Sequence, residues 1–360
     1  MSQELFRRLI ARAEIDGTPL RDRSQNRWIE RLSVGDADLM ATADVEALAL
    51  SRQVRAARVS HHDRVYFIFF GFGPPTDSVL GLSSVDATPG LFALAVLHLD
   101  IAATATPWAI REAVEAFHAG VGGYSGHGLA QIMPLFPELR FFSADVNFPF
   151  TTDIIRATGS YASRTYADGP LAFEDETCET LATSFEAGHA TIPHMLVLQG
   201  VLSFSWASLY LEIYRCIEQL FAVPRISALV KEWPSNLALY DVAELVERHL
   251  SWRPREDESL AKILRNCDSG SVDIALDAFG CSPSEVEDQR VGQVARSIYG
   301  LRNQLVHFRP HKDVPTRNDQ SWNLIIRAML LCVFEIYDAV GAAFHDAPDV
   351  VEKEIEAMAT

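Results

Sequence analysis

The chain has 360 residues, of which 48% are hydrophobic and 22% charged, and its formal net charge is -17 at pH 7. This composition is typical of a packed protein with room for two domains and excludes a disordered chain. The negative charge argues against a protein that coats DNA, because most of the surface would repel the phosphate backbone.

The cysteines and the N-terminal residues indicate a cellular compartment. The chain holds 5 cysteines at long spacings, with no Cys-x-x-Cys pair, so the sequence shows neither a zinc ribbon nor a redox motif. The first residues lack the apolar stretch of a secretory signal peptide. We therefore expect a cytoplasmic protein with reduced thiols, without a bound metal and without a cofactor.

The first part of the chain predicts a mixture of helices and strands. Residues 1–60 carry apolar side chains at helical spacings, and residues 107–120 begin with proline and end with glycine, as helices often do. The runs 64–75 and 139–150 are strand-like and are bounded by turn residues. Residues 90–101 fit either a buried strand or a buried helix.

The second part of the chain predicts helices almost throughout. Residues 151–185 are polar and predict an irregular segment, with a solvated turn or cap at 174–179. From about residue 195 helical patterns alternate with prolines, which end helices. The predicted helices are 201–221, 240–250, 258–267, 291–308 and 321–345.

These patterns define the expected architecture. We predict an α+β N-terminal domain over residues 1–190, followed by an all-α helical bundle over residues 191–360. The stretch Ala187–Leu211 contains no Asp, Glu, Lys or Arg, but it includes glycines, a proline, two histidines and three serines. We interpret it as a loop and a buried helix, and we expect no membrane span.

Two N-terminal motifs can be interpreted either as a binding site or as a loop or turn. The glycine-rich stretch 118–128 lacks the pattern of a phosphate-binding P-loop, and we interpret it as a loop. His61, His62 and Asp63 are of metal-ligating types, but no second cluster is visible in the sequence. We therefore interpret them as a turn before the strand that begins at residue 64.

A basic segment interrupts the acidic chain near its C-terminus. Residues 290–317 contain six basic residues and one acidic residue, a net charge of +5. A cluster of this kind suits a polyanion, although a charge run taken alone is more often a solvated helix face that pairs with acidic neighbours. Within it, Arg302 is followed directly by Asn303 and then by His307.

Arg302, Asn303 and His307 have the chemistry of a phosphodiester-cleaving group. A histidine can accept and donate a proton near neutral pH, and an arginine stabilises the negative charge that develops on a phosphate. This chemistry indicates RNA, because its 2'-hydroxyl can attack the adjacent phosphate. Asn303 and His307 share a helix face, whereas Arg302 lies about 140° away from His307. A symmetric dimer can complete such a site with a second copy of the helix.

The C-terminal part resembles the HEPN domains, an all-α family with an R-x4-6-H motif in which Asn often follows the Arg. RNQLVH (302–307) has the R-N-x3-H form of this motif and precedes a final apolar helix, and YLEIYRCIEQLF (210–221) is similar to an early HEPN helix. Active members of the family are metal-independent endoribonucleases that dimerise, and many serve as toxins or in anti-phage defence.

The resemblance implies roles for particular residues. It implies an endoribonuclease that leaves 2',3'-cyclic phosphate ends, with Arg302, Asn303 and His307 as its catalytic residues. A polar residue on an earlier helix often supports such a site, and Glu212 or Glu218 fits that position, Glu218 being the one we select. The remaining candidates for support or RNA binding are Arg296, Arg309 and His311.

Alternatives remain at this point. Some relatives are non-catalytic, so the bundle can instead be a binding, antitoxin-like or scaffold module that mediates oligomerisation. For an RNA-cleaving effector, we expect residues 1–190 to bind a trigger or partner that controls activity. A phage protein, a nucleotide or a nucleic acid can serve as this trigger.

Overall fold

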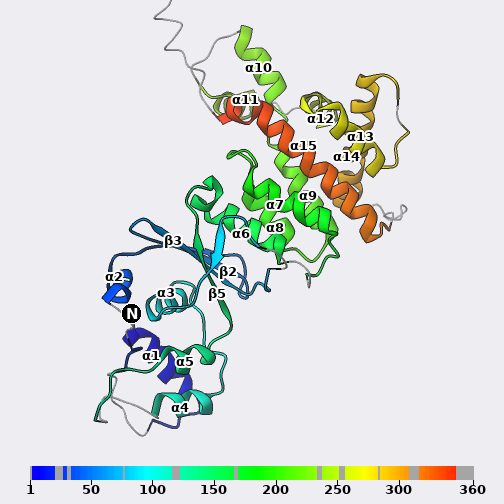
Figure 1. Ribbon diagram of the computed structural model, residues 1–360. Coiled ribbons are helices and arrows are strands. Elements are labelled where there is room, and N and C mark those ends of the chain that lie inside the picture. The colour runs from blue at the N-terminus through cyan, green and yellow to red at the C-terminus, as the bar shows by residue number, and fades with distance from the viewer. Residues whose placement is uncertain are drawn as a thin grey trace, which may run out of the picture. The chain divides into compact units, whose positions relative to one another are not determined.

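The computed structural model describes residues 2–20, 27–30, 34–75, 78–115, 122–165, 169–232, 237–250, 256–282, 284–307 and 316–345. The chain divides into two compact units, Met1–Thr158 and Gly159–Thr360. Figure 1 shows strands and helices in the first unit and helices in the second. The architecture is therefore mixed, with a small antiparallel sheet followed by a mostly helical part.

A five-stranded sheet forms the centre of the first unit. Its order is β1-β2-β3-β5-β4, and each neighbouring pair is antiparallel. The strands are β1 (Asp44–Ala49), β2 (Arg55–His61), β3 (Arg64–Phe70), β4 (Leu82–Ser84) and β5 (Leu139–Ala144). The expected strands at 64–75 and 139–150 are confirmed by β3 and β5. The helical prediction for residues 1–60 is wrong for β1 and β2, which pair into the sheet.

Helices accompany the sheet in this unit. They are α1 (Ser2–Ala13), α2 (Val34–Thr42), α3 (Pro89–His98), α4 (Pro107–Glu115) and α5 (Leu129–Ile132), with 3-10 turns at Met133–Leu135 and Pro149–Thr152. One hydrophobic cluster joins Phe6 of α1, Ile68 of β3, Phe92 of α3 and Ile110 of α4. This cluster is the core of the unit.

The segment that fitted both a strand and a helix is the helix α3. Thr88 caps its N-terminus, because the Thr88 side chain accepts a hydrogen bond from the backbone N–H of Leu91. Every residue from Pro89 to Val96 is buried. A helix that is buried on all sides has no polar face, and its hydrophobic pattern therefore lacks the period that distinguishes a helix from a strand.

The second unit consists of helices. They are α6 (Ile154–Arg164, which crosses the boundary at residue 158), α7 (Asp175–Glu186), α8 (His194–Val201), α9 (Trp206–Glu218), α10 (Val223–Glu232), α11 (Leu239–Leu250), α12 (Glu256–Ile263), α13 (Ser269–Ala278), α14 (Glu287–Val306) and α15 (Asp319–His345), with a 3-10 turn at Leu264–Asn266. The long helix α15 packs against α7, α9 and α13 (Figure 1).

Buried tyrosines connect the helices of this unit. The hydroxyl of Tyr210 on α9 donates a hydrogen bond to the backbone carbonyl of Ile298 on α14, at 2.7 Å. The hydroxyl of Tyr337 on α15 donates to the carbonyl of Cys216 on α9, at 2.8 Å. Buried polar groups need partners of this kind, and these bonds fix α9 against both α14 and α15.

The helical prediction for the C-terminal part is confirmed in kind, with differences in detail. The helix expected at 201–221 is α9, which begins only at Trp206, because α8 ends at Val201 and the chain turns at residues 202–205. Helices α10 and α13 were not predicted. No helix in the described part of the chain is long and apolar enough to span a membrane, and Ala187–Leu211 forms a loop, α8 and the start of α9.

The prediction of an irregular segment over residues 151–185 is wrong, because α6 and α7 lie there. Of the turn or cap expected at 174–179, the cap is confirmed, because Glu174 is the N-cap of α7. The second unit begins within α6 and includes all of α7, so the boundary expected at residue 190 lies inside that unit. The close approach of the helices explains this, since a Cβ atom at Gly159 would lie 2.3 Å from the Phe185 ring.

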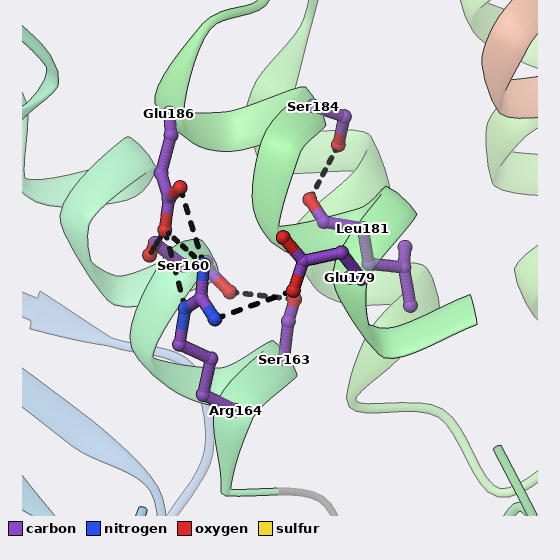
Figure 2. Close-up of polar contacts among 8 residues, drawn as sticks. Ser160, Ser163, Arg164, Glu179, Leu181, Ser184 and Glu186 are labelled. Carbon is purple, nitrogen blue, oxygen red and sulfur yellow. Dashed lines mark hydrogen bonds and ion pairs between the residues drawn. The ribbon is translucent and has the colours of Figure 1, made fainter. Parts of the chain in front are cut away.

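Polar side chains also hold α6 against α7 (Figure 2). Nη2 of Arg164 lies 3.1 Å from Oε1 of Glu186, and the hydroxyl of Ser160 donates to the same oxygen at 2.5 Å. Only 15% of the Arg164 side chain and 10% of the Glu186 side chain are exposed. Such polar side chains are common in segments outside helices, and this is why their composition predicted an irregular stretch.

Candidate functional site

Arg302 lies near the C-terminal end of α14, where α14 packs beside α9 and α12. Only 19% of its side chain is exposed. Its Nη2 atom is 3.9 Å from Oε1 of Glu218 on α9 and 3.8 Å from Oε1 of Glu256 on α12. Its guanidinium carbon lies 5.8 Å from the centre of the Tyr214 ring on α9. Two carboxylates and an aromatic face therefore fix the direction of the guanidinium.

Asn303 is a partner of the arginine. Nη1 of Arg302 donates a hydrogen bond to Oδ1 of Asn303, at 3.1 Å. The backbone carbonyl of Asn303 accepts the N–H of His307, also at 3.1 Å. Asn303 is thus linked to both residues of the predicted motif, through its side chain to Arg302 and through its backbone to His307.

His307 follows the last residue of α14. The predicted helix 291–308 is confirmed as α14, which ends at Val306, and His307 is its C-cap with φ -102° and ψ 107°. The His307 side chain is exposed. Its ring has no hydrogen bond or ion pair with any residue that the structure describes, so the imidazole faces solvent while Arg302 is held by its neighbours.

The carboxyl of Glu218 has an altered acidity. Burial is the main cause that raises its pKa above the ordinary value, and the negative charge of Glu256 raises it further. The charges of Arg302 and Arg215 act in the opposite direction. Glu218 thus retains its proton to higher pH than an exposed glutamate does, although it lies beside an arginine.

Tyr214 is the second group of the site with a shifted pKa. Its hydroxyl donates a hydrogen bond to Oε2 of Glu256, at 3.3 Å. Burial raises the pKa of Tyr214 strongly, and the charges of Glu256 and Glu218 raise it further. The phenol is therefore neutral at physiological pH and acts as a donor to Glu256 and as a ring beneath Arg302.

The other predicted residues are placed as follows. Arg296 is exposed on α14. Arg309 and His311 lie outside the described residues. Glu212, the alternative to Glu218, forms an ion pair with Arg215 at 2.6 Å. The structure thus brings together Arg302, Asn303 and Glu218 from the predicted set.

The sequence reasoning missed Tyr214 and Glu256. Tyr214 precedes Glu218 by four residues on α9, so the two share a helix face, and this spacing was a usable signal. Glu256 begins a different helix, 42 residues after Tyr214. No sequence pattern connects these two, and only the packing of α12 against α14 brings Glu256 to Arg302.

Comparisons of the chain with protein families, with curated proteins and with solved structures found no match. The chemistry of the site is therefore argued from its own groups. Arg302 can bind a phosphate oxygen through N–H groups that its carboxylate neighbours do not saturate. The exposed imidazole of His307 can transfer a proton. Among the described residues, the one group of three metal-ligating side chains lies in the first unit, at Asp38, His61 and His62.

Proposed function

We propose that the helical unit is a HEPN-like domain and that the protein is a metal-independent endoribonuclease of the toxin or anti-phage type. The observation that carries this proposal is the presence, at the end of one helix, of a positioned Arg302 and a solvent-facing His307. Arginine and histidine can supply the two functions that RNA cleavage without a metal needs, one for phosphate charge and one for proton transfer.

The reaction assigns a role to each group. A neutral His307 imidazole takes the proton from the 2'-hydroxyl of RNA as that oxygen forms a bond to the adjacent phosphorus. The bond from phosphorus to the 5'-oxygen breaks, and a protonated imidazole supplies the proton to that oxygen. The products are a 2',3'-cyclic phosphate and a 5'-hydroxyl. Arg302 stabilises the charge on the phosphate oxygens, and Asn303 holds the guanidinium.

Two protonation states of histidine are needed at once, and a homodimer would supply them. Arg302 and His307 are five residues apart, which is about 140° around a helix axis, so one copy of α14 does not present both to a single phosphate. A second α14 related by two-fold symmetry would bring the partner's histidine to the same phosphate. We therefore propose that the helical unit dimerises through this end of α14.

The test uses the purified full-length chain, total RNA and a labelled tRNA in the presence of EDTA. The variants are Arg302→Ala and His307→Ala. The matched controls are Arg265→Ala, whose arginine is exposed beside Asp288, and His98→Ala, whose histidine is exposed at the end of α3. We expect cleavage by the wild type and both controls, a loss of at least 100-fold in the two site variants, and 2',3'-cyclic phosphate ends.

Equal cleavage by all five proteins would reject the assignment of the site. If none of them cleaves RNA in vitro, expression in bacteria provides the decision. Growth inhibition by the wild type that is absent in His307→Ala supports the nuclease. Growth without inhibition by either protein favours the second candidate function.

The second candidate is a non-catalytic module that mediates oligomerisation. The observation in its favour is that Arg302 already has two carboxylates within 4.0 Å in its own chain, which compensate its charge without RNA. Sedimentation of the wild type and of Arg302→Ala tests it. A stable assembly that lacks ribonuclease activity and dissociates in Arg302→Ala would support this function.

For the nuclease, the first unit has a regulatory role in our proposal. Uncontrolled RNA cleavage damages the cell that carries it, and the sheet-containing unit carries neither Arg302 nor His307. We propose that this unit binds the trigger or partner that releases activity. A truncated chain that begins at residue 153, just before α6, should then inhibit growth more strongly than the full-length chain.

A further inference from the structure

Two neighbouring histidines of the first unit converge on one carboxylate oxygen. Nε2 of His61 lies 3.0 Å from Oδ2 of Asp38, and Nε2 of His62 lies 2.9 Å from the same atom. The two imidazole rings have centroids 4.1 Å apart. The three ligand atoms all lie within 4.8 Å of one another. Adjacent residues of a strand normally point to opposite faces of a sheet, so this convergence requires a specific backbone conformation.

The turn between β2 and β3 provides that conformation. His61 pairs with Arg64 at the end of the two strands, so His62 and Asp63 form a two-residue turn. His62 has φ +51°, a left-handed conformation that few residues other than glycine adopt. In a two-residue hairpin the first turn position commonly needs a positive φ, and glycine or asparagine usually occupies it. Histidine adopts this conformation less readily than glycine, and non-glycine residues with a positive φ occur often at functional positions.

Asp38 reaches the turn from a separate element. It lies on α2, and α2 packs against α3. The neighbouring residue Asp36 is buried and accepts a hydrogen bond from the backbone N–H of Gly90 at the start of α3, at 3.1 Å. This bond fixes α2 next to α3, and it therefore holds the Asp38 carboxylate at the turn.

The two distances from the carboxylate to the imidazoles are compatible with a single metal ion. Two ligand atoms bound at about 2.0–2.2 Å from one ion lie about 2.8–3.1 Å apart at octahedral angles and about 3.3–3.6 Å apart at tetrahedral angles. The distances from Oδ2 of Asp38 to the imidazole nitrogens, 3.0 Å and 2.9 Å, match the octahedral separation, and a shift of a few tenths of an ångström gives the tetrahedral one. In the described structure the histidines share the carboxylate as hydrogen-bond partners, and an ion would take the lone pairs of the same three atoms.

We propose that Asp38, His61 and His62 form a binding site for a borderline transition-metal dication of the Zn²⁺ class. Two imidazoles and one carboxylate are the donor set of three-ligand zinc sites and of related transition-metal sites. Mg²⁺ and Ca²⁺ prefer oxygen ligands only. The exposed fractions are 14% for His61, 67% for His62 and 48% for Asp38. The outer positions of the ion therefore face solvent and are open to water or to a ligand from another molecule.

The site differs from the proposed nuclease site in unit, residues and chemistry. It stands whether or not the helical unit cleaves RNA. A metal ion here would join α2 to the β2–β3 turn. An open coordination position would let a carboxylate or imidazole of a second molecule bind to the first unit.

The experiment is a calorimetric titration of the full-length chain with Zn²⁺, after EDTA treatment and dialysis. The protein must carry no polyhistidine tag. The variants are His62→Asn, which keeps a residue that tolerates a positive φ, and Asp38→Asn, which keeps the size of the side chain. The control is His98→Asn, whose histidine is exposed on α3. Circular dichroism confirms that each variant is folded.

We expect one Zn²⁺ per chain in the wild type and in His98→Asn, and an affinity at least tenfold weaker in both site variants. Co²⁺ should give a visible absorption band that Zn²⁺ removes and a tenfold excess of Mg²⁺ does not. Unchanged zinc affinity in folded His62→Asn and Asp38→Asn would overturn the proposal, because other groups would then hold the ion. Absence of zinc binding in the wild type, or equal competition by Mg²⁺, would overturn it as well.

Discussion

Arg302 and Tyr214 meet across two helices, with the guanidinium carbon 5.8 Å from the centre of the phenol ring. The same phenol donates a hydrogen bond to Glu256, which is one of the two carboxylates beside Arg302. Tyr214 is therefore in contact with the arginine through its ring and with a carboxylate partner of that arginine through its hydroxyl.

Tyr214→Phe and Tyr214→Leu separate these two contacts. The first keeps the ring and removes the hydrogen bond, and should lower the free energy of unfolding by about 1 kcal/mol. The second also removes the ring from a buried position, and should cost about 3 kcal/mol. Urea denaturation measures both. Equal destabilisation by the two variants would show that the ring contributes nothing beyond its hydroxyl.

Glu218 should make stability depend on pH. Its pKa is raised in the folded chain, mainly by burial and then by the charge of Glu256. The folded state therefore binds the proton more tightly than the unfolded state. This contribution to stability is present below the ordinary glutamate pKa of 4.5 and is lost as the pH rises through the raised value.

The variant Glu218→Gln removes this titration. The unfolding free energy of the wild type minus that of the variant should fall as the pH rises from about 4 to 7. Urea denaturation at a series of pH values measures the difference. Glu285→Gln, at an exposed carboxyl, serves as the control. A difference that rises with pH would contradict the direction of the shift.

The ion pair of Arg164 with Glu186 in Figure 2 should contribute to stability more than an exposed pair does. Glu186→Gln leaves a largely buried guanidinium with the exposed carboxylate of Glu179, 3.5 Å away, in place of its buried charge partner, and should cost about 3 kcal/mol. Arg265→Ala removes an exposed pair with Asp288, with 58% and 74% of the side chains exposed, and should cost less than about 1 kcal/mol. Thermal or urea unfolding measures both, and equal costs would show that the burial of the pair has no effect.

Two glycines with similar backbone angles should respond differently to alanine. Gly71 has φ +81°, and a Cβ atom there would lie 1.6 Å from the carbonyl oxygen of Gln53. Gly17 has φ +80° with no atom within 4 Å of such a Cβ. Gly17→Ala should therefore cost only the backbone strain, about 1 kcal/mol, and Gly71→Ala more than about 3 kcal/mol, because the chain must also move. Similar unfolding free energies in both variants would contradict the close approach at Gly71.

Some elements were predictable because their pattern is local. The strand β3 is bounded by turn residues, and α14 and α15 carry long helical periodicities between prolines. The strands β1 and β2 were not predictable in this way. Their sequences, DVEALA and RAARVSH, are rich in alanine and charged residues, which have low strand propensity. Pairing with β3 overrides that propensity.

The candidate site shows the same limit. Arg302, Asn303 and His307 were accessible from the sequence because they are close together on one segment. Glu218 could be predicted because a second helix was expected to support the motif. Glu256 could not be predicted, because α12 reaches α14 only through the packing of the helical unit. His61 and His62 were interpreted as part of a turn. The third member of their cluster in the structure, Asp38, lies on α2, and no sequence pattern connects α2 with this turn.

The order of the sheet has a consequence for how copies of this chain behave at high concentration. The strand β1 is an edge strand, and its residues Asp44 and Glu46 are exposed. Unpaired edges attract other strands, and charged side chains on an edge oppose such pairing. A second β1 laid along the first would bring carboxylates together in a chain that already carries a charge of -17. The other edge, β4, spans only Leu82–Ser84. The sheet is thus poorly suited to grow into ordered aggregates.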